Sequence, residues 1–159
     1  MAKKTKQTKT LPIYILNGPN LNLLGHREPE VYGYTTLAQI EEMCGTQAAS
    51  HGLSIVFRQS NREGEIVDHL QEARTAGSAV IINPAGYGHT SIAILDSIQA
   101  CGLPVIEVHL SNIHRREPYR NHSYVSKGAT GIIMGLGAQG YVRAVDAVAQ
   151  ILSTKGKKK

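Results

Sequence analysis

Ionisable side chains stand close together near the end of one apolar run. The run Pro104–Leu110 carries Glu107 and His109, and the alternation of a strand would place both side chains on the same side. A carboxylate beside an imidazole fixes its tautomer and favours its protonated form. A lone strand histidine is commonly a hydrogen-bonded core residue, but a polar loop follows this one directly. His109 is therefore a candidate general acid, oriented by Glu107.

A long segment separates the first apolar run, Leu11–Leu16, from the helical pattern that starts after Thr36. Strand-to-helix loops usually take about 2 to 6 residues, and much longer ones commonly bind ligands. This segment holds Arg27 and Tyr32. A nearby guanidinium favours the phenolate form of a tyrosine, which can then act as a base. Taken alone, the segment is better explained by a packing tyrosine and a solvated arginine.

Two further loops carry groups suited to an oxygen-rich or anionic ligand. Small residues in Asn83–Ser91 expose backbone N–H groups just before a helical pattern. Arg115, Arg116 and Arg120 follow the run that holds His109. Exposed loop arginines are commonly solvated, but a guanidinium can bind a carboxylate through two hydrogen bonds. We expect at least one of the three arginines to point inward.

Two suggestive patterns predict no site of their own. Residues 135–140 spell G-x-G-x-x-G, but no further strand and no acidic residue for a ribose follow, so we interpret the glycines as close helix packing. A zinc site is the second pattern considered, with His89, His109, His114, His122 and Glu107 as ligands. These residues do not have the tight spacing of zinc ligands, so no metal site is expected.

The charge is concentrated at the two ends of the chain. The formal net charge is +5, from 17 basic and 12 acidic residues, but eight of the lysines lie in the terminal segments. The body therefore keeps nine basic residues against 12 acidic ones and has no basic face for nucleic acid. We predict a disordered Lys-rich tail at 1–10, a single catalytic domain at 11–153 and a second tail at 154–159.

The remaining composition indicates a soluble protein of the cytoplasm. Cys44 and Cys101 lie in apolar helical patterns without C-x-x-C spacing, which predicts reduced core cysteines. No apolar run approaches the roughly 20 residues that span a bilayer, and the start has no apolar signal region. We therefore expect no membrane partner and a cytoplasmic location.

Strand and helix patterns alternate along the chain. Helices are predicted from Thr36, where a capping box with Gln39 begins a stripe that ends at Gly52, and then at Glu65–Ala76, Thr90–Ala100 and Gln139–Leu152. Strands are predicted at Leu11–Leu16, Leu53–Gln59, Ala79–Asn83, Pro104–Leu110 and Gly131–Leu136. This order predicts an α/β three-layer sandwich around a doubly wound, five-stranded parallel sheet of flavodoxin-like strand order. Ligands bind at the carboxyl ends of such strands.

Seven sequence blocks, in order, closely resemble the type II 3-dehydroquinases. They are Asn17-Gly-Pro-Asn-Leu-Asn-Leu-Leu-Gly, Arg27-Glu-Pro-x-x-Tyr-Gly, Arg58-Gln-Ser-Asn, Asn83-Pro, His89-Thr-Ser, Glu107-Val-His-Leu-Ser-Asn and Arg116-Glu-Pro-Tyr-Arg. The resemblance implies a cofactor-free dehydration of 3-dehydroquinate to 3-dehydroshikimate, by anti elimination through an enolate. It also implies that no Schiff-base lysine is used, and Lys127 is the only lysine outside the tails.

The resemblance implies a role for each matching residue. Tyr32 is similar to the base that removes the C2 proton, with Arg27 beside it, and Asn20 to the residue that positions a water at the enolate oxygen. His109, oriented by Glu107, matches the acid that protonates the departing hydroxyl. The positions similar to the substrate-binding residues are Asn83, His89, Leu110, Ser111 and Arg120, together with Asp96, which matches a residue that reaches a neighbouring subunit.

The resemblance further implies a dodecamer assembled from trimers. The sequence departs from the family pattern at Gly88, where threonine is usual, and at Tyr119, where phenylalanine is usual. The same dehydration serves aromatic amino acid biosynthesis and quinate breakdown, and the residues do not distinguish them. A flavodoxin-like module that binds phosphate or a flavin is the alternative hypothesis.

Overall fold

Five parallel strands form a single sheet in a computed structural model that describes residues 10–156. The strand order is β2-β1-β3-β4-β5, which confirms the predicted flavodoxin-like doubly wound sheet. Residues 1–9 of the predicted N-terminal tail and residues 157–159 of the predicted C-terminal tail lie outside the described residues. The strands are β1 (Ile13–Asn17), β2 (Ile55–Gln59), β3 (Ala79–Asn83), β4 (Val105–His109) and β5 (Gly131–Met134).

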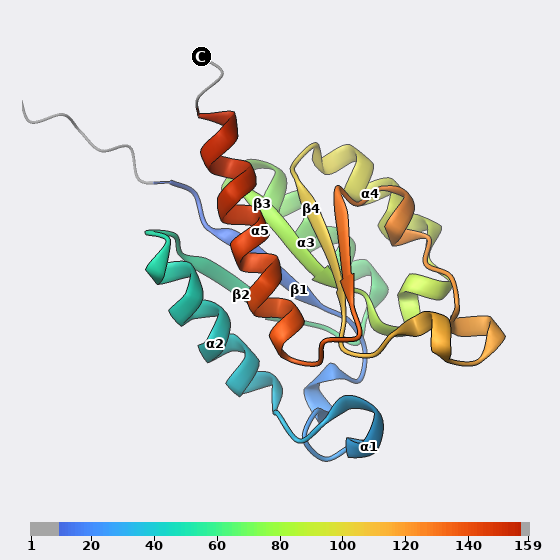
Figure 1. Ribbon diagram of the computed structural model, residues 1–159. Coiled ribbons are helices and arrows are strands. Elements are labelled where there is room, and N and C mark those ends of the chain that lie inside the picture. Colours follow the sequence, from blue (N-terminus) through green and yellow to red (C-terminus); the bar gives the residue numbers. More distant parts are fainter. Residues whose placement is uncertain (1–9, 157–159) are drawn as a thin grey trace, which may run out of the picture.

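Four long helices cover the sheet, with α2 and α5 on one face and α3 and α4 on the other (Figure 1). The predicted capping box is present, because Thr36 Oγ1 accepts from Gln39 N and Gln39 Oε1 accepts from Thr36 N. Two starts differ from the sequence pattern. One predicted helix begins at Glu63 instead of Glu65, and another begins at Ile92 instead of Thr90, with Ser91 as the cap that accepts from Ile94 N. The helices are α2 (Leu37–Ser50), α3 (Glu63–Ala76), α4 (Ile92–Cys101) and α5 (Gln139–Lys155). The last helix thus ends three residues later than predicted.

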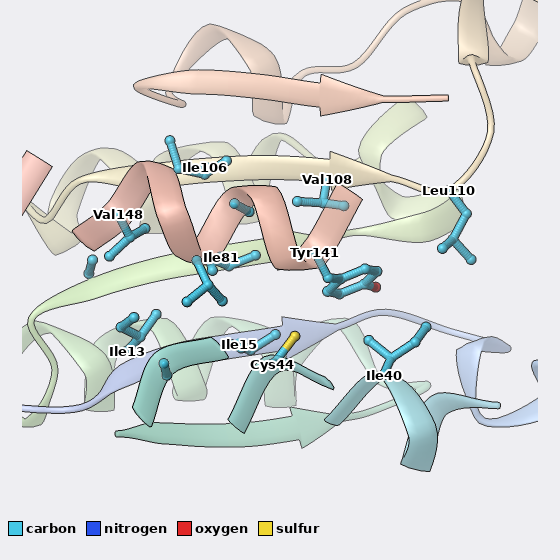
Figure 2. Packing of buried hydrophobic residues seen from close by; sticks show 14 of the residues in the cluster. Ile13, Ile15, Ile40, Cys44, Ile81, Ile106, Val108, Leu110, Tyr141 and Val148 are labelled. Atoms are coloured by element: carbon cyan, nitrogen blue, oxygen red, sulfur yellow. The ribbon is translucent and has the colours of Figure 1, made fainter. Parts of the chain in front are cut away.

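Apolar side chains fill both spaces between sheet and helices. Every residue of β1, β3 and β4 is buried, as expected for central strands with helices on both faces. Figure 2 shows the cluster between the sheet and the α2/α5 layer, which includes Ile15, Cys44, Ile81 and Tyr141. Both cysteines are free and buried, as predicted. Within residues 10–156, no helix combines the length and apolar composition needed to cross a bilayer.

The long segment after β1 lies at the carboxyl ends of the strands (Figure 1). It contains one short helix that the sequence pattern does not predict, α1 (Pro29–Tyr32). Proline at its first position suits a helix start, and Gly33 ends it with φ 80°. A helix of four residues is too short to show an apolar stripe, which is why periodicity does not detect it.

The sheet also brings β1 and β3 together at their carboxyl ends. Asn17 stands in register with Asn83, and the N–H of Gly18 donates to the Asn83 carbonyl over 2.8 Å. A Cβ on Gly18 would lie 2.3 Å from the Pro84 carbonyl oxygen. The close approach of these two strand ends therefore requires glycine at position 18.

We predict that Gly18→Ala lowers the free energy of unfolding by about 2 kcal/mol or more, because the backbone of Pro84 must move to make room. Gly64→Ala is the control: this helical glycine has open space around it, so alanine should add about 0.5 to 1 kcal/mol. Urea denaturation at equal protein concentration measures both. A Gly18→Ala protein as stable as the wild type would contradict the account.

Candidate active site

One cavity of about 170 Å³ opens at the carboxyl ends of β1, β3 and β4. The long segment after β1 and the loops after β3 and β4 supply its walls. Nine of the eleven residues that the sequence analysis selects line it: Asn20, Arg27, Tyr32, Asn83, His89, His109, Leu110, Ser111 and Arg120. Residues from separate parts of the chain thus converge where doubly wound sheets bind ligands.

Glu107 lies behind His109 rather than in the cavity wall. Its carboxylate has no exposure to solvent, and Oε1 accepts a hydrogen bond from His109 Nε2 over 2.6 Å. Ser123 Oγ donates to the same oxygen over 2.5 Å, and Ser126 Oγ donates to Oε2. With Nε2 bound to the carboxylate, Nδ1 is the ring atom that His109 can offer to a ligand.

The Glu107 carboxyl is held in its charged form. Burial raises its pKa, but the hydrogen bond and charge of His109 and the hydroxyls of Ser123 and Ser126 outweigh burial, so the pKa lies below the ordinary value. Gly88 contributes indirectly, since a Cβ there would lie 3.2 Å from Ser123 Oγ. A side chain at position 88 would therefore crowd this serine.

The Tyr32 hydroxyl meets an arginine that the sequence analysis does not select. Arg116 Nη1 donates to the Tyr32 oxygen over 2.8 Å, and the Arg116 guanidinium carbon lies 5.3 Å from the ring centroid. Arg27 lies over the same ring at 5.5 Å. One guanidinium thus donates to the Tyr32 oxygen, and two positive charges lie against the ring. The expectation that at least one of the three loop arginines points inward is met by two, because Arg116 and Arg120 line the cavity.

His89 is fixed by a reciprocal pair of hydrogen bonds. Its Nδ1 donates to the carbonyl of His122 over 2.6 Å, and His122 Nε2 donates to the carbonyl of His89 over 3.0 Å. Burial, with the charges of His109 and Arg120, lowers the pKa of His89 despite the opposing effect of the carbonyl of His122. A neutral ring with a proton on Nδ1 presents Nε2 as an acceptor for a ligand hydroxyl.

Two cavity residues adopt left-handed backbone conformations that are uncommon outside glycine. Asn20 has φ 67° and Ala85 has φ 50°. The Asn20 N–H donates to Asn61 Oδ1 over 2.9 Å, and Ala85 N–H donates to Asn83 Oδ1 over 3.1 Å. The Arg58–Asn61 block therefore supports the site from behind and does not line the cavity. Surrounding hydrogen bonds hold the unfavourable conformations.

One more residue that the sequence analysis selects for the site lies outside the cavity. Asp96 is exposed on α4 and does not line the cavity. Besides Arg116, the sequence analysis misses Ser123 and Ser126, whose only sequence signal is their place in the loop that returns from β4 to β5. Among residues 10–156, no three His, Cys, Asp or Glu side chains gather as a metal would require.

The chain matches the family described as dehydroquinase class II over residues 11–149. A 3-dehydroquinate dehydratase of Streptomyces avermitilis is 57% identical over 152 residues, covering 95% of this chain and 96% of that protein. One of Streptomyces coelicolor is 59% identical over 141 residues, covering 88% and 90%. The crystal structure of the type II dehydroquinase from Propionibacterium acnes superposes with a TM-score of 0.85 at 40% identity, covering 89% of this chain and 97% of that one. The matched range includes every residue that lines the cavity.

We predict that Ser126→Ala lowers the free energy of unfolding by about 1.5 to 3 kcal/mol at pH 7, because a buried carboxylate loses a donor. The pKa of Glu107 is lowered by folding, so its charged form stabilises the protein above pH 4.5 and this contribution fades as the pH falls further. The loss caused by Ser126→Ala should therefore shrink below pH 4.5.

Urea denaturation from pH 7 to pH 3.5 measures this. Ser153→Ala is the matched control, since the exposed Ser153 Oγ donates only to the carbonyl of Gln150, and its effect should stay within about 0.5 kcal/mol. A loss for Ser126→Ala that is equal at every pH would show that its hydroxyl does not serve the carboxylate.

Proposed function

This chain belongs to the class II dehydroquinase family, so its activity is that of a 3-dehydroquinate dehydratase, and we propose that Tyr32 and His109 are the base and the acid. One observation carries the assignment of roles. A tyrosine oxygen held by a guanidinium and a histidine held by a buried carboxylate line the same small cavity. One group is arranged to accept a proton and the other to give one.

The first step is removal of a proton from C2 of the substrate. The Tyr32 phenolate takes this proton, and the electron pair moves into the adjacent carbonyl to form an enolate. Arg116 donates to the Tyr32 oxygen and Arg27 lies over the ring, so both hold positive charge beside the base during the transfer. Asn20, held in its unusual conformation by Asn61, positions a water at the enolate oxygen.

The second step expels the hydroxyl group. The enolate collapses, the bond from carbon to the hydroxyl breaks, and His109 transfers a proton from Nδ1 so that the group leaves as water. After the reaction Tyr32 releases its proton to solvent and His109 takes one up. Both residues are then ready for another turnover. Glu107 stabilises the imidazolium that precedes this transfer through its bond to Nε2.

The other cavity residues bind the substrate. Arg120 is the partner for its carboxylate, and Nε2 of His89 accepts from a substrate hydroxyl. Asn83 and the backbone of Leu110 and Ser111 complete the contacts. A hydroxylated ring with a single carboxylate is the class of ligand that the Arg120 guanidinium recognises together with these neutral donors and acceptors.

Two competing chemistries fit the cavity less well. A Schiff-base mechanism needs a lysine in the site, but Lys127 is exposed and no lysine among residues 10–156 lines the cavity. A flavin-binding module needs more room than about 170 Å³, since pockets for larger ligands start near 300 Å³. Turnover of 3-dehydroquinate by a colourless preparation without additives would exclude the flavin alternative.

We also propose that the enzyme assembles into a dodecamer built from trimers. The support is the position of Asp96, which the family resemblance assigns to a neighbouring subunit's site and which is exposed on α4, outside its own cavity. Ile92, also on α4, is an exposed apolar side chain that such an interface would cover.

We place the enzyme in the cytoplasm, an assignment supported by the free buried cysteines Cys44 and Cys101.

We predict that Tyr32→Phe lowers kcat by about a hundredfold to ten-thousandfold, because the ring keeps its packing but loses the oxygen that accepts the proton. His109→Ala should have an effect of similar size. The absorbance of the conjugated enone product measures the rate. Tyr34→Phe is the matched control, since Tyr34 is 80% exposed, and should keep wild-type turnover. Near-normal turnover by either active-site variant would reject its assigned role.

We predict that Arg116→Gln lowers kcat by about tenfold to a hundredfold, because the Tyr32 oxygen loses the charged donor that holds it over 2.8 Å. The exposed neighbour Arg115 does not line the cavity, so Arg115→Gln should keep wild-type turnover. Wild-type turnover by Arg116→Gln would mean that Arg116 does not act through the base.

A further inference from the structure

The glycine-rich turn between β5 and α5 is tied to the backbone beside the site. Gly135 and Gly137 have φ values of 85° and 58°, which glycine adopts readily. The Gly135 N–H donates to the carbonyl of His109 over 3.2 Å, and the Gly137 N–H donates to that of Leu110 over 2.9 Å. The turn therefore starts α5 directly against the segment that carries the acid.

The first turn of α5 places the Tyr141 hydroxyl at the last residues of β1 and β3. The side chain has no exposure to solvent and packs within the core cluster, but it does not line the cavity. Figure 2 shows its hydroxyl directed toward the carboxyl ends of the strands, beyond Ile81 and Ile15. The hydroxyl donates to Asn17 Oδ1 over 2.7 Å and accepts from Asn83 Nδ2 over 2.9 Å.

Groups at both ends fix the direction of this chain of hydrogen bonds. The carbonyl of Arg58 can only accept, and Asn17 Nδ2 donates to it over 3.0 Å, which leaves Asn17 Oδ1 as an acceptor. Tyr141 must therefore donate to Asn17 and accept from Asn83. At the other end the N–H of Ala85 can only donate, so it takes Asn83 Oδ1. Neither amide can turn over without breaking two bonds.

Asn83 is consequently held in one orientation at the cavity wall. Its oxygen faces Ala85 N, and one of its two Nδ2 hydrogens faces Tyr141. The second hydrogen remains for a ligand, because an amide nitrogen has two. Burial raises the pKa of the Tyr141 hydroxyl, so that the hydroxyl keeps its proton for Asn17 throughout the neutral range.

We propose that Tyr141 is a positioning residue that makes Asn83 present an N–H donor to a substrate oxygen. The proposal rests on the dehydratase function, since Asn83 acts on the substrate and Tyr141 acts only through Asn83. It also gives the glycine-rich turn a purpose: the turn brings α5 close enough for Tyr141 to reach the ends of β1 and β3. The site therefore selects a ligand with an oxygen acceptor at this point.

Tyr141→Phe tests the proposal because it keeps the ring and removes the hydroxyl. The KM for 3-dehydroquinate should rise about fivefold, the scale of one neutral hydrogen bond, while kcat stays within about twofold, since the contact is made before and during reaction. Tyr14→Phe is the matched control. Tyr14 is also buried, its hydroxyl donates to Glu72 Oε1 over 2.9 Å, and it packs in the cluster on the other face of the sheet.

Tyr14→Phe should leave KM unchanged even where its unfolding midpoint falls as much as that of Tyr141→Phe. In a background of Asn83→Ala, adding Tyr141→Phe should raise KM no further, because the residue through which it acts is gone. An unchanged KM for Tyr141→Phe, or effects of the two substitutions that multiply, would overturn the proposal. A wild-type enzyme without turnover would instead overturn the proposed function.

Asn83→Asp decides the matter if Tyr141→Phe does not fold. The aspartate has the shape of the amide, but its carboxylate only accepts, so it offers no donor to the Tyr141 hydroxyl or to the substrate oxygen. Its KM should rise at least tenfold in a protein with a wild-type circular dichroism spectrum. A KM within twofold of wild type would show that no donor is needed at this point.

Discussion

The site depends on a carboxylate that is charged in a place without water. Burial of an unpaired charge costs several kcal/mol, so Glu107 is stable there only while its oxygens keep their donors. Two of those donors, Ser123 and Ser126, come from the loop that leaves β4 and returns to β5. The stability of the core thus requires this loop to close over β4.

Closure of that loop also supplies one wall of the cavity. The same stretch of chain carries Arg116, which binds the Tyr32 hydroxyl, and Arg120, which lines the cavity. It also carries His122, whose reciprocal bonds with His89 attach the loop to the turn after β3. The loop that supplies donors to the Glu107 carboxylate therefore also positions the Arg116 guanidinium beside Tyr32. The acid and the base are coupled through the loop rather than by direct contact.

Much of this arrangement follows from patterns in the sequence, and the physical reason for each miss is specific. Apolar periodicity and the Thr36 capping box predict the strands and long helices, and strand alternation alone places Glu107 beside His109. Periodicity cannot separate Arg116 from its solvated neighbour Arg115, because inward direction is decided by loop closure. Ser123 and Ser126 reach Glu107 from 16 and 19 residues away, a contact that no local pattern records.

Tyr141 illustrates a different limit of sequence analysis. An aromatic residue at a buried helix position is ordinarily a core residue, and the ring of Tyr141 is one. Its second property, a hydroxyl at the junction of Asn17 and Asn83, exists only because parallel strands end at a common edge and α5 starts close to it. Asp96 differs from Tyr141 in that the family resemblance selects it as a site residue. In the structure of one chain, however, Asp96 does not line the cavity.

The central claim is that protons move between side chains and substrate without a covalent intermediate. Incubation with 3-dehydroquinate and sodium borohydride, followed by an activity assay and intact-mass measurement, tests it most directly. A lysine imine would be reduced to a stable adduct, whereas an enolate mechanism leaves nothing to reduce. The account predicts full activity and an unmodified mass. Loss of activity with an adduct on Lys127, the lysine outside the terminal segments, would contradict it.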